Sequence, residues 1–267
     1  MTEIHPSAVV EEGARLGENV HVGPFCVVGP EVELGEGVVL DGHCVVTGRT
    51  ELGAGCRVYP FASVGTTPQD MKYAGEPSRL TVGARTTIRE HVTLNPGTRG
   101  GGMHTRVGAD CLLMVGVHVA HDCTVGDGVI MANQATLGGH VTVEDGAVLG
   151  GITAVHQFVR IGSGAMIGGM TGVEHDVIPF GMAMGNRARL QGLNIVGLRR
   201  RNVAHSAIQT LRQAYNELFC GTAGTFQQRL AGVAERYGDD PRVAQVLAFL
   251  RADASRPLCQ PPGTDDG

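Results

Sequence analysis

An aliphatic side chain recurs every six residues along most of this chain, and few folds satisfy that spacing. From Ile4 to Val64, eleven successive positions at this spacing are Ile, Leu or Val, and the spacing returns over 82–94 and again over 107–173. An α-helix repeats every 3.6 residues and a strand every two, so neither element explains a period of six. The hexad is the signature of a parallel β-helix, in which three hexads close one triangular coil of 18 residues.

The composition agrees with such an array and excludes several other classes. The chain of 267 residues has 41 glycines, no Trp and only 4% aromatic residues, which is typical of tight turns and small aliphatic side chains. The net charge of −5 argues against a nucleic-acid-binding protein. No apolar run reaches the roughly 18 residues of a membrane span, and the N-terminus has no basic region followed by an apolar run, so we predict no signal peptide.

Seven cysteines are scattered along the chain without a C-x-x-C pair. Scattered, unpaired spacing favours reduced and mostly structural thiols, as in a cytosolic protein. We therefore predict a cytoplasmic location.

The hexads also divide the chain. We predict a β-helix over residues 1–186, with loop inserts near 66–80 and 95–106, where polar residues with Gly and Pro interrupt the repeat. Helical spacing of apolar residues predicts a small α-helical domain over 187–255, with Thr225 and Asp240–Pro241 as helix starts. A flexible tail is expected over 256–267.

The 18-residue coil predicts which side chains share a face. His121 should stack on Gly139 and Gln157, one and two coils away, with His140 beside them. Because His121 comes two residues after an inward aliphatic position, it should lie outside the core. Gly138 and Gly139 would leave a notch beside the imidazole, with free backbone N–H groups at its floor.

Such a notch contains the parts of a direct acyl transfer. A neutral His121 could accept a proton from a hydroxyl group near neutral pH, and Asp122 could orient the ring. The N–H of Gly139 could donate to a developing oxyanion. Neither a Ser nor a Cys nucleophile is required.

Other interpretations of the same residues remain open. His121 could be a solvated surface residue, and Asp122 could satisfy turn amides. His118 and His121 form an H-x-x-H pair that could hold a metal with a third histidine of a neighbouring chain, as in β-helical carbonic anhydrases, although we predict no metal. A catalytically inert scaffold is the third alternative.

Several motifs together resemble one bacterial enzyme family. The insert "PQDMKYAGEPSR", the core "HVAHDCTVG", and then "LGGHVTV", "GGITAVHQFVRIG" and "GLNIVGLRRR" are similar, in this order, to UDP-N-acetylglucosamine 3-O-acyltransferases. The resemblance covers essentially the whole chain. It implies a left-handed β-helix and a homotrimer with active sites between neighbouring prisms. It also implies transfer of an (R)-3-hydroxyacyl chain from acyl carrier protein to the 3-OH of UDP-GlcNAc, the first step of lipid A biosynthesis. No cofactor is expected, because the acyl-phosphopantetheine arrives on acyl carrier protein as a substrate.

The resemblance also assigns roles to individual residues. It makes His121 the general base, Asp122 its support and Gly139 the oxyanion donor. The residues implied to bind substrate are Gln69, Asp70, Lys72, His118, His140, His156, Gln157, Asn194, Arg200 and Arg201. Of these, Gln69, Asp70 and Lys72 are expected to reach the substrates across the subunit interface, and the basic residues Arg199–Arg201 suit the acidic acyl carrier protein.

Two positions depart from the family pattern. Val196 stands where relatives carry Glu, and Arg187 replaces a His, which puts details of nucleotide binding in question. The family's acyl-length determinant falls near Gly169 and Met170. The same transfer to a 3-amino UDP-sugar is an alternative that these residues do not exclude.

Overall fold

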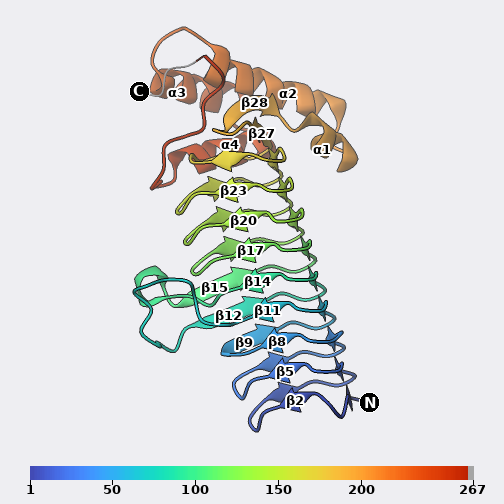
Figure 1. Cartoon of the computed structure of the whole chain (residues 1–267). Helices are drawn as coiled ribbons and strands as arrows, with labels where there is room; N and C mark the ends of the chain where they lie inside the picture. The colour runs from blue at the N-terminus through green and yellow to red at the C-terminus, as the bar shows by residue number, and fades with distance from the viewer. Residues whose placement is uncertain (264–267) are drawn as a thin grey trace.

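The hexads build a left-handed parallel β-helix, seen as a tall triangular prism in the computed structural model (Figure 1). The structure describes residues 1–263. Three parallel sheets, which we name A, B and C, form the faces, and each coil passes from A to B to C before it returns to A. Every coil therefore has an A–B, a B–C and a C–A corner.

Most strands have two residues, as a six-residue side with a tight turn requires. Sheet A contains β1 (Glu3–Ile4), β4 (His21–Val22), β7 (Val39–Leu40), β10 (Arg57–Val58), β13 (Thr87–Ile88), β16 (Leu112–Leu113), β19 (Ile130–Met131), β22 (Val148–Leu149), β25 (Met166–Ile167), β27 (Gly181–Met184) and β28 (Arg189–Leu193). Sheet B contains β2 (Val9–Val10), β5 (Val27–Val28), β8 (Val45–Val46), β11 (Ser63–Val64), β14 (Thr93–Leu94), β17 (His118–Val119), β20 (Thr136–Leu137), β23 (Ala154–Val155) and β26 (Gly172–Val173). Sheet C contains β3 (Arg15–Leu16), β6 (Glu33–Leu34), β9 (Arg49–Leu52), β12 (Arg79–Val82), β15 (His104–Val107), β18 (Thr124–Val125), β21 (Thr142–Val143) and β24 (Arg160–Ile161).

The core is a set of aliphatic columns inside the prism. Val119 pairs in register with Leu137, and Leu137 pairs with Val155, at the 18-residue spacing expected from the sequence. All three side chains are buried, and Leu137 is fully inaccessible. Each aliphatic residue thus covers the one below it, about 4.8 Å away along the sheet.

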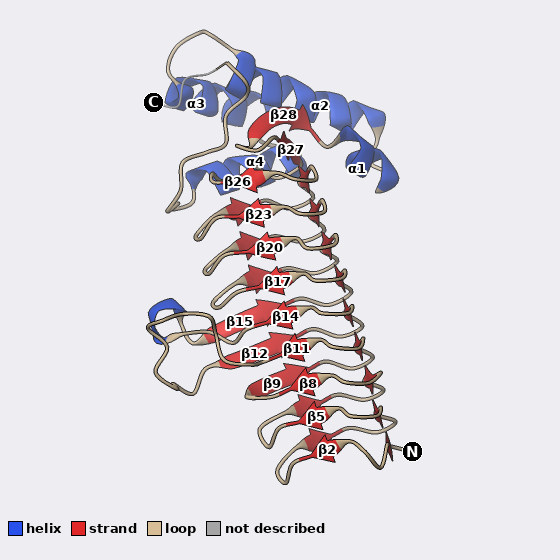
Figure 2. Ribbon diagram, in the orientation of Figure 1, coloured by secondary structure: helices blue, strands red, loops and turns tan. Residues whose placement is uncertain are grey.

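Both inserts leave the prism at the B–C corner. Val64 pairs with Leu94, thirty residues on instead of 18, so the first insert adds twelve residues between β11 and β12. Leu94 pairs with Val119, 25 residues on, so the second insert adds seven between β14 and β15 and includes the short 3₁₀ helix η1 (Arg99–Gly101). In Figure 2 the two loops project side by side from the same edge.

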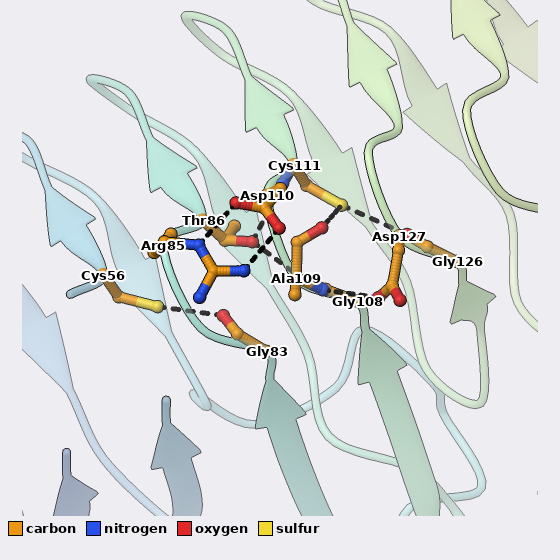
Figure 3. A network of polar contacts seen from close by, with 10 residues as sticks. All are labelled: Cys56, Gly83, Arg85, Thr86, Gly108, Ala109, Asp110, Cys111, Gly126 and Asp127. Atoms are coloured by element: carbon orange, nitrogen blue, oxygen red, sulfur yellow. Dashed lines mark hydrogen bonds and ion pairs between the residues drawn. The ribbon is translucent and has the colours of Figure 1, made fainter. Parts of the chain in front are cut away.

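The C–A corner is closed by polar contacts between successive coils (Figure 3). Arg85 donates to both oxygens of Asp110 at 2.7 and 2.6 Å, and the thiol of Cys111 donates to the carbonyl of Gly126 at 3.1 Å. All seven cysteines are free thiols, and every one except Cys220 is buried. The cysteines are thus structural for the most part, because six of them lie inside the prism or its cap.

Four α-helices gather at the C-terminal end of the prism (Figure 1). They are α1 (Ile195–Arg200), α2 (His205–Tyr215), α3 (Phe226–Tyr237) and α4 (Pro241–Arg251), and α2 continues into the π-helix η2 (Asn216–Cys220). The two predicted helix starts are confirmed. Thr225 forms a capping box with Gln228, and the Asp240 side chain accepts from the first turn of α4. Within residues 1–263, none of these helices is long and apolar enough to cross a membrane.

The junction between prism and helices differs from the expected boundary at residue 187. Strand β28 pairs antiparallel with β27, and helix begins only at Ile195. The apolar spacing after Arg199 is continuous and gives no sign of the break between α1 and α2. At this break Asn202 has a left-handed φ of 57°, which ends a right-handed helix.

The prediction of a flexible tail over 256–267 is wrong for residues 256–260. The carbonyl of Pro257 accepts from the Asp176 N–H at 2.8 Å, and Cys259 is fully buried. Polar and Pro-rich composition suggested fraying, but the chain here adds a backbone bridge to the last coil. Residues 264–267 of the predicted tail lie outside the described residues.

Replacing an inward aliphatic residue should open a cavity that neighbouring coils cannot fill. Leu137→Ala is expected to lower the free energy of unfolding by about 2–5 kcal/mol, measured by urea denaturation followed by circular dichroism. Val9→Ala, at a side chain that is 54% exposed, is the control and should change it by less than about 0.5 kcal/mol. Equal effects of the two variants would mean that the aliphatic columns do not stabilise the prism.

Candidate active site

Most of the predicted site residues meet at the B–C corner. The turns that follow β17, β20 and β23 lie at this corner, one coil above another, and they carry His121, Gly139 and Gln157 in one column. His140 follows Gly139 in the middle turn. The expected stacking is confirmed by the strand register, because His118 pairs with Thr136 in the adjacent coil.

His121 and Asp122 form a buried pair. The Nδ1 atom of His121 lies 2.9 Å from Oδ2 of Asp122, and the two residues are each only 8% exposed. His121 lies outside the hydrophobic core, as expected, but it is not a solvated surface residue. An ionised carboxylate can only accept, so Nδ1 carries the proton and Nε2 keeps its lone pair. This is the tautomer that a general base requires.

The second insert holds the carboxylate of Asp122 from the other side. The backbone N–H of Thr98 donates to Oδ1 at 2.9 Å, and the Thr98 hydroxyl donates to Oδ2 at 2.6 Å. The hydroxyl of Thr105 accepts from the Asp122 N–H at 2.7 Å. The two bonds from Thr98 fix the carboxylate rotamer, so that Oδ2 stays on the histidine, and the Thr105 bond holds the backbone. Asp122 thus accepts from a backbone amide, as the alternative interpretation expected, but it also holds His121.

Sequence reasoning missed Thr98, Thr105 and Glu76. The carboxylate of Glu76 accepts from the N–H groups of Ala74 and Arg99, at 2.9 Å each, and these bonds lower its pKa. Glu76 thus ties the first insert to the second, which in turn holds Asp122. The only signal in the sequence was the position of both inserts at one corner, which follows from counting hexads.

Gly139 lies directly against the imidazole. A Cβ placed on Gly139 would lie 2.5 Å from Cε1 and 2.7 Å from Nε2 of His121, so any larger residue would displace the ring. The N–H of Gly139 donates no hydrogen bond to residues 1–263, whereas the N–H of Gly138 donates to Val155 at 2.9 Å. The expectation of several free N–H groups is thus wrong for Gly138 and right for Gly139.

Two further histidines border the notch. Burial lowers the pKa of His118, with a smaller contribution from His121, and its Nδ1 atom lies 2.7 Å from the Thr93 hydroxyl. The ring of His140 packs edge-on against His121, at a centroid distance of 5.0 Å, and stacks on Phe158 at 4.4 Å. Burial also lowers the pKa of His140. Both imidazole rings therefore stay neutral to a lower pH than the ring of a free histidine.

The first insert brings Asp70 near the same corner of its own chain. The charge of Asp70 acts on His140, where it opposes the lowering of the histidine pKa by burial. An oxygen of Asp70 also accepts from the Lys72 N–H at 2.9 Å, which forms a tight local turn. Gln69 and Lys72 are exposed.

Three other predicted residues, Asn194, Arg200 and Arg201, lie elsewhere in the chain. A pocket of about 630 Å³ on the outer face of sheet A is lined by Asn194, Val196, Arg200 and Arg201 together with apolar side chains. Asn194 caps α1 by accepting from Gly197, and it also donates to the carbonyl of Gly164, so both ends of its side chain are engaged.

The predicted acyl-length residues are also remote from His121. Gly169 and Met170 occupy the turn between β25 and β26, at the A–B corner, and Met170 is 74% exposed. Of the two departures from the family pattern, Val196 is 59% exposed in the pocket, and Arg187 pairs with Glu174 at 3.2 Å. One chain therefore does not bring all the predicted residues together.

The residues that could hold a metal differ from the H-x-x-H pair of the alternative interpretation. In the described part of the chain, ligand atoms of His121, Asp122 and His140 converge within 4.8 Å of one another, and His118 is not among them. Both oxygens of Asp122 already accept from Thr98, and Oδ2 also accepts from His121. A cation would have to displace these bonds, so the arrangement favours a base with its support.

Comparisons with known proteins agree with this geometry. A model of the bacterial transferase hexapeptide repeat matches residues 104–139, and a model described as UDP-N-acetylglucosamine O-acyltransferase, domain 2, matches residues 176–259. The acyl-[acyl-carrier-protein]–UDP-N-acetylglucosamine O-acyltransferase of Methylobacterium radiotolerans is 57% identical over 97% of this chain and 94% of that relative. The chain belongs to this family. The enzyme of the same name from Azorhizobium caulinodans is 55% identical over 97% of this acyltransferase and 95% of the relative.

A solved structure supports the same family. The UDP-N-acetylglucosamine acyltransferase from Campylobacter jejuni superposes with a TM-score of 0.90 and 37% identity, and the match covers 97% of this chain and all of that one. The chain is thus an acyltransferase with the left-handed β-helix of its relatives.

The contact between Thr98 and Asp122 can be tested in the acyltransferase. Thr98→Val removes the hydroxyl donor and keeps the backbone one, so Asp122 should orient His121 less well and kcat should fall roughly tenfold. Thr98→Ser keeps the hydroxyl and should retain most of the activity. Turnover by Thr98→Val equal to that of the unmodified enzyme would show that this bond does not support the pair.

Burial of His118 predicts a pH dependence of stability. Because its folded pKa is lowered, the unfolded chain binds the proton first, so the contribution is complete above about pH 6.5 and is lost as the pH falls through the folded pKa. His118→Gln should therefore reduce the fall in Tm between pH 7.5 and 5, measured by differential scanning fluorimetry. His5→Gln, at an exposed histidine, is the control. An unchanged pH dependence in His118→Gln would contradict the assignment.

Proposed function

We propose that this acyltransferase moves an (R)-3-hydroxyacyl group from acyl carrier protein to the 3-OH of UDP-GlcNAc, the first step of lipid A biosynthesis. One observation carries the proposal. The His121 ring lies between the Asp122 carboxylate, which holds Nδ1, and Gly139, whose N–H is unused within the described chain. A base and an oxyanion donor therefore flank the same small space.

In the proposed mechanism, Nε2 of His121 accepts the proton of the sugar 3-OH as its oxygen attacks the thioester carbonyl carbon. The imidazolium that forms is stabilised by Asp122. The N–H of Gly139 donates to the oxyanion of the tetrahedral intermediate. The intermediate then collapses by breaking the carbon–sulfur bond, and the phosphopantetheine thiolate takes the proton from His121. The products are the 3-O-acyl sugar nucleotide and the free carrier thiol.

No resident cofactor is needed for this sequence of steps. The acyl group is already activated as a thioester when it arrives, and the sugar hydroxyl is itself the nucleophile. His118 and His140, kept neutral by burial, can form hydrogen bonds with uncharged sugar or acyl groups without adding charge to the notch. Asp70 on the first insert, whose charge acts on His140, carries a carboxylate that can accept from a sugar hydroxyl or amide.

We further propose that the working enzyme is a homotrimer. Within one chain, the pocket with Arg200 and Arg201 lies on sheet A, whereas His121 lies at the B–C corner. A neighbouring prism could present its pocket and its Met170 to this corner, which would complete the site. Arginines suit the diphosphate of the nucleotide and the acidic acyl carrier protein. Free, buried thiols are compatible with the proposed cytoplasmic location.

The proposal is tested by supplying acyl carrier protein thioesters of several chain lengths with UDP-GlcNAc or with its 3-amino analogue, and by identifying the products by mass spectrometry. We expect an ester at the 3-position of UDP-GlcNAc. In the same assay, His121→Ala should lower kcat by about a hundredfold or more, because it removes the base. His5→Gln, at the far N-terminal coil, should leave the rate unchanged.

Three outcomes would overturn the proposal. Transfer to the 3-amino sugar alone would assign a different acceptor. A folded His121→Ala variant with the kcat of the unmodified enzyme would show that His121 is not the base. Stoichiometric zinc or iron in the purified protein, with no acyl transfer, would favour the metalloenzyme alternative.

A further inference from the structure

The segment 255–260, which we name the C-terminal strap, is fastened to the end of the prism. The N–H of Asp176 donates to Pro257 and the N–H of Cys259 donates to Asp176, both at 2.8 Å. The N–H of Leu190 donates to Gln260 at 2.9 Å. The buried Cys259 side chain adds packing to these bonds. The strap is therefore held on both sides of Leu258, and Arg256 directly precedes the first of the bonded residues.

Arg256 reaches from the strap to the turn after β23. Its Nε atom donates to the carbonyl of Gln157 at 2.9 Å, and its Nη2 atom lies 2.7 Å from Nδ1 of His156. A guanidinium group can only donate hydrogen bonds. Nδ1 of His156 must therefore be the acceptor, which leaves the proton of the neutral ring on Nε2.

A second possible hydrogen bond of Nδ1 would favour the other tautomer of His156. Nδ1 of His156 also lies 3.3 Å from the carbonyl oxygen of Gln157, and a bond there would require the proton on Nδ1. Arg256 opposes that arrangement, because its Nη2–H group needs the one lone pair of Nδ1 as its acceptor. Without Arg256, the carbonyl of Gln157 would lose its donor, and the nearest replacement would be the Nδ1–H of His156.

His156 and Gln157 stand directly above the glycine notch. The 18-residue register places His156 over Gly138 and Gln157 over Gly139, so Gln157 lies one coil beyond Gly139 and two coils beyond His121. A Cβ on Gly138 would lie 3.1 Å from Cγ of Gln157, so the glutamine side chain leans down over the notch. A side chain that fixes the turn after β23 would therefore fix one border of the proposed site.

We infer that Arg256 is a positioning residue of the acyltransferase: it holds His156 in the tautomer that donates from Nε2–H and fixes the backbone that carries Gln157. The Nε2–H group would donate to a phosphate or carbonyl oxygen of the substrate. This inference rests on the proposed function and on the substrate-binding roles that the family resemblance implies for His156 and Gln157. It extends the site to a strap from the helical end of the chain, about one hundred residues beyond the turn.

The tautomer can be measured without any substrate. Protein with ¹⁵N-labelled histidine would be examined by long-range ¹H–¹⁵N correlation at a pH where the ring is neutral, and the His156 signals would be assigned by their loss in His156→Gln. We expect protonation on Nε2 in the unmodified protein and a clear rise of the Nδ1–H form in Arg256→Leu. Arg256→Lys keeps a group that can only donate and should restore much of the Nε2–H form.

Activity provides the second readout. Arg256→Leu should lower kcat/KM for acyl transfer about tenfold, with an intermediate value for Arg256→Lys, since only positioning is lost. Arg251→Leu, at the exposed end of α4, is the matched control and should leave both the tautomer and kcat/KM unchanged. The Tm of each variant would show whether the strap remains in place.

The outcomes separate this inference from the proposed function. A His156 tautomer that does not change in a folded Arg256→Leu variant overturns the inference, whatever the activity. A shifted tautomer with unchanged kcat/KM overturns its functional part. If the unmodified protein transfers no acyl group, the proposed function fails, while the tautomer measurement still decides whether Arg256 positions His156.

Discussion

The structure depends on the stacking of one inward aliphatic side chain on the next at a spacing of 18 residues. Most strands have only two residues and could not persist alone, because so short a strand makes few hydrogen bonds and buries one side chain. In the prism, Leu137 is covered by Val119 on one side and by Val155 on the other. The same in-register repetition gives every corner a defined neighbour above and below. It therefore supplies a rigid scaffold on which side chains outside the core can be placed accurately.

The site arises where that regularity is interrupted. Two glycines remove the side chains that would otherwise fill the column beside His121, and Gly139 allows the ring to lie against the backbone. Two inserts at the same corner then cover the turn that carries Asp122. Glu76 links the two inserts by accepting from the second one, and Thr98 of the second insert donates two hydrogen bonds to the Asp122 carboxylate. The rigid coils fix the backbone of the His121–Asp122 pair, whereas the loops fix its hydrogen bonds.

The C-terminal cap contributes more than an end to the prism. Strand β28 and the helices cover the last coil, which would otherwise leave an open sheet edge. The strap then runs back along the prism, and Arg256 bonds with the same column of turns that carries the notch. The two parts that the sequence separates, repeat and helical domain, are thus joined at the border of the proposed site.

The sequence by itself determined the fold class, the 18-residue register and the column of His121, Gly139 and Gln157. It could do so because a strict period converts position in the chain directly into position in space. Only the tertiary structure decided what surrounds that column. Thr98 and Glu76 lie in inserts without a repeat, Arg256 lies in a segment whose composition suggested fraying, and helix α1 was hidden in a continuous apolar pattern. Their roles depend on contacts between segments far apart in the chain. A local sequence period cannot predict such contacts, because they form only when the whole chain is folded.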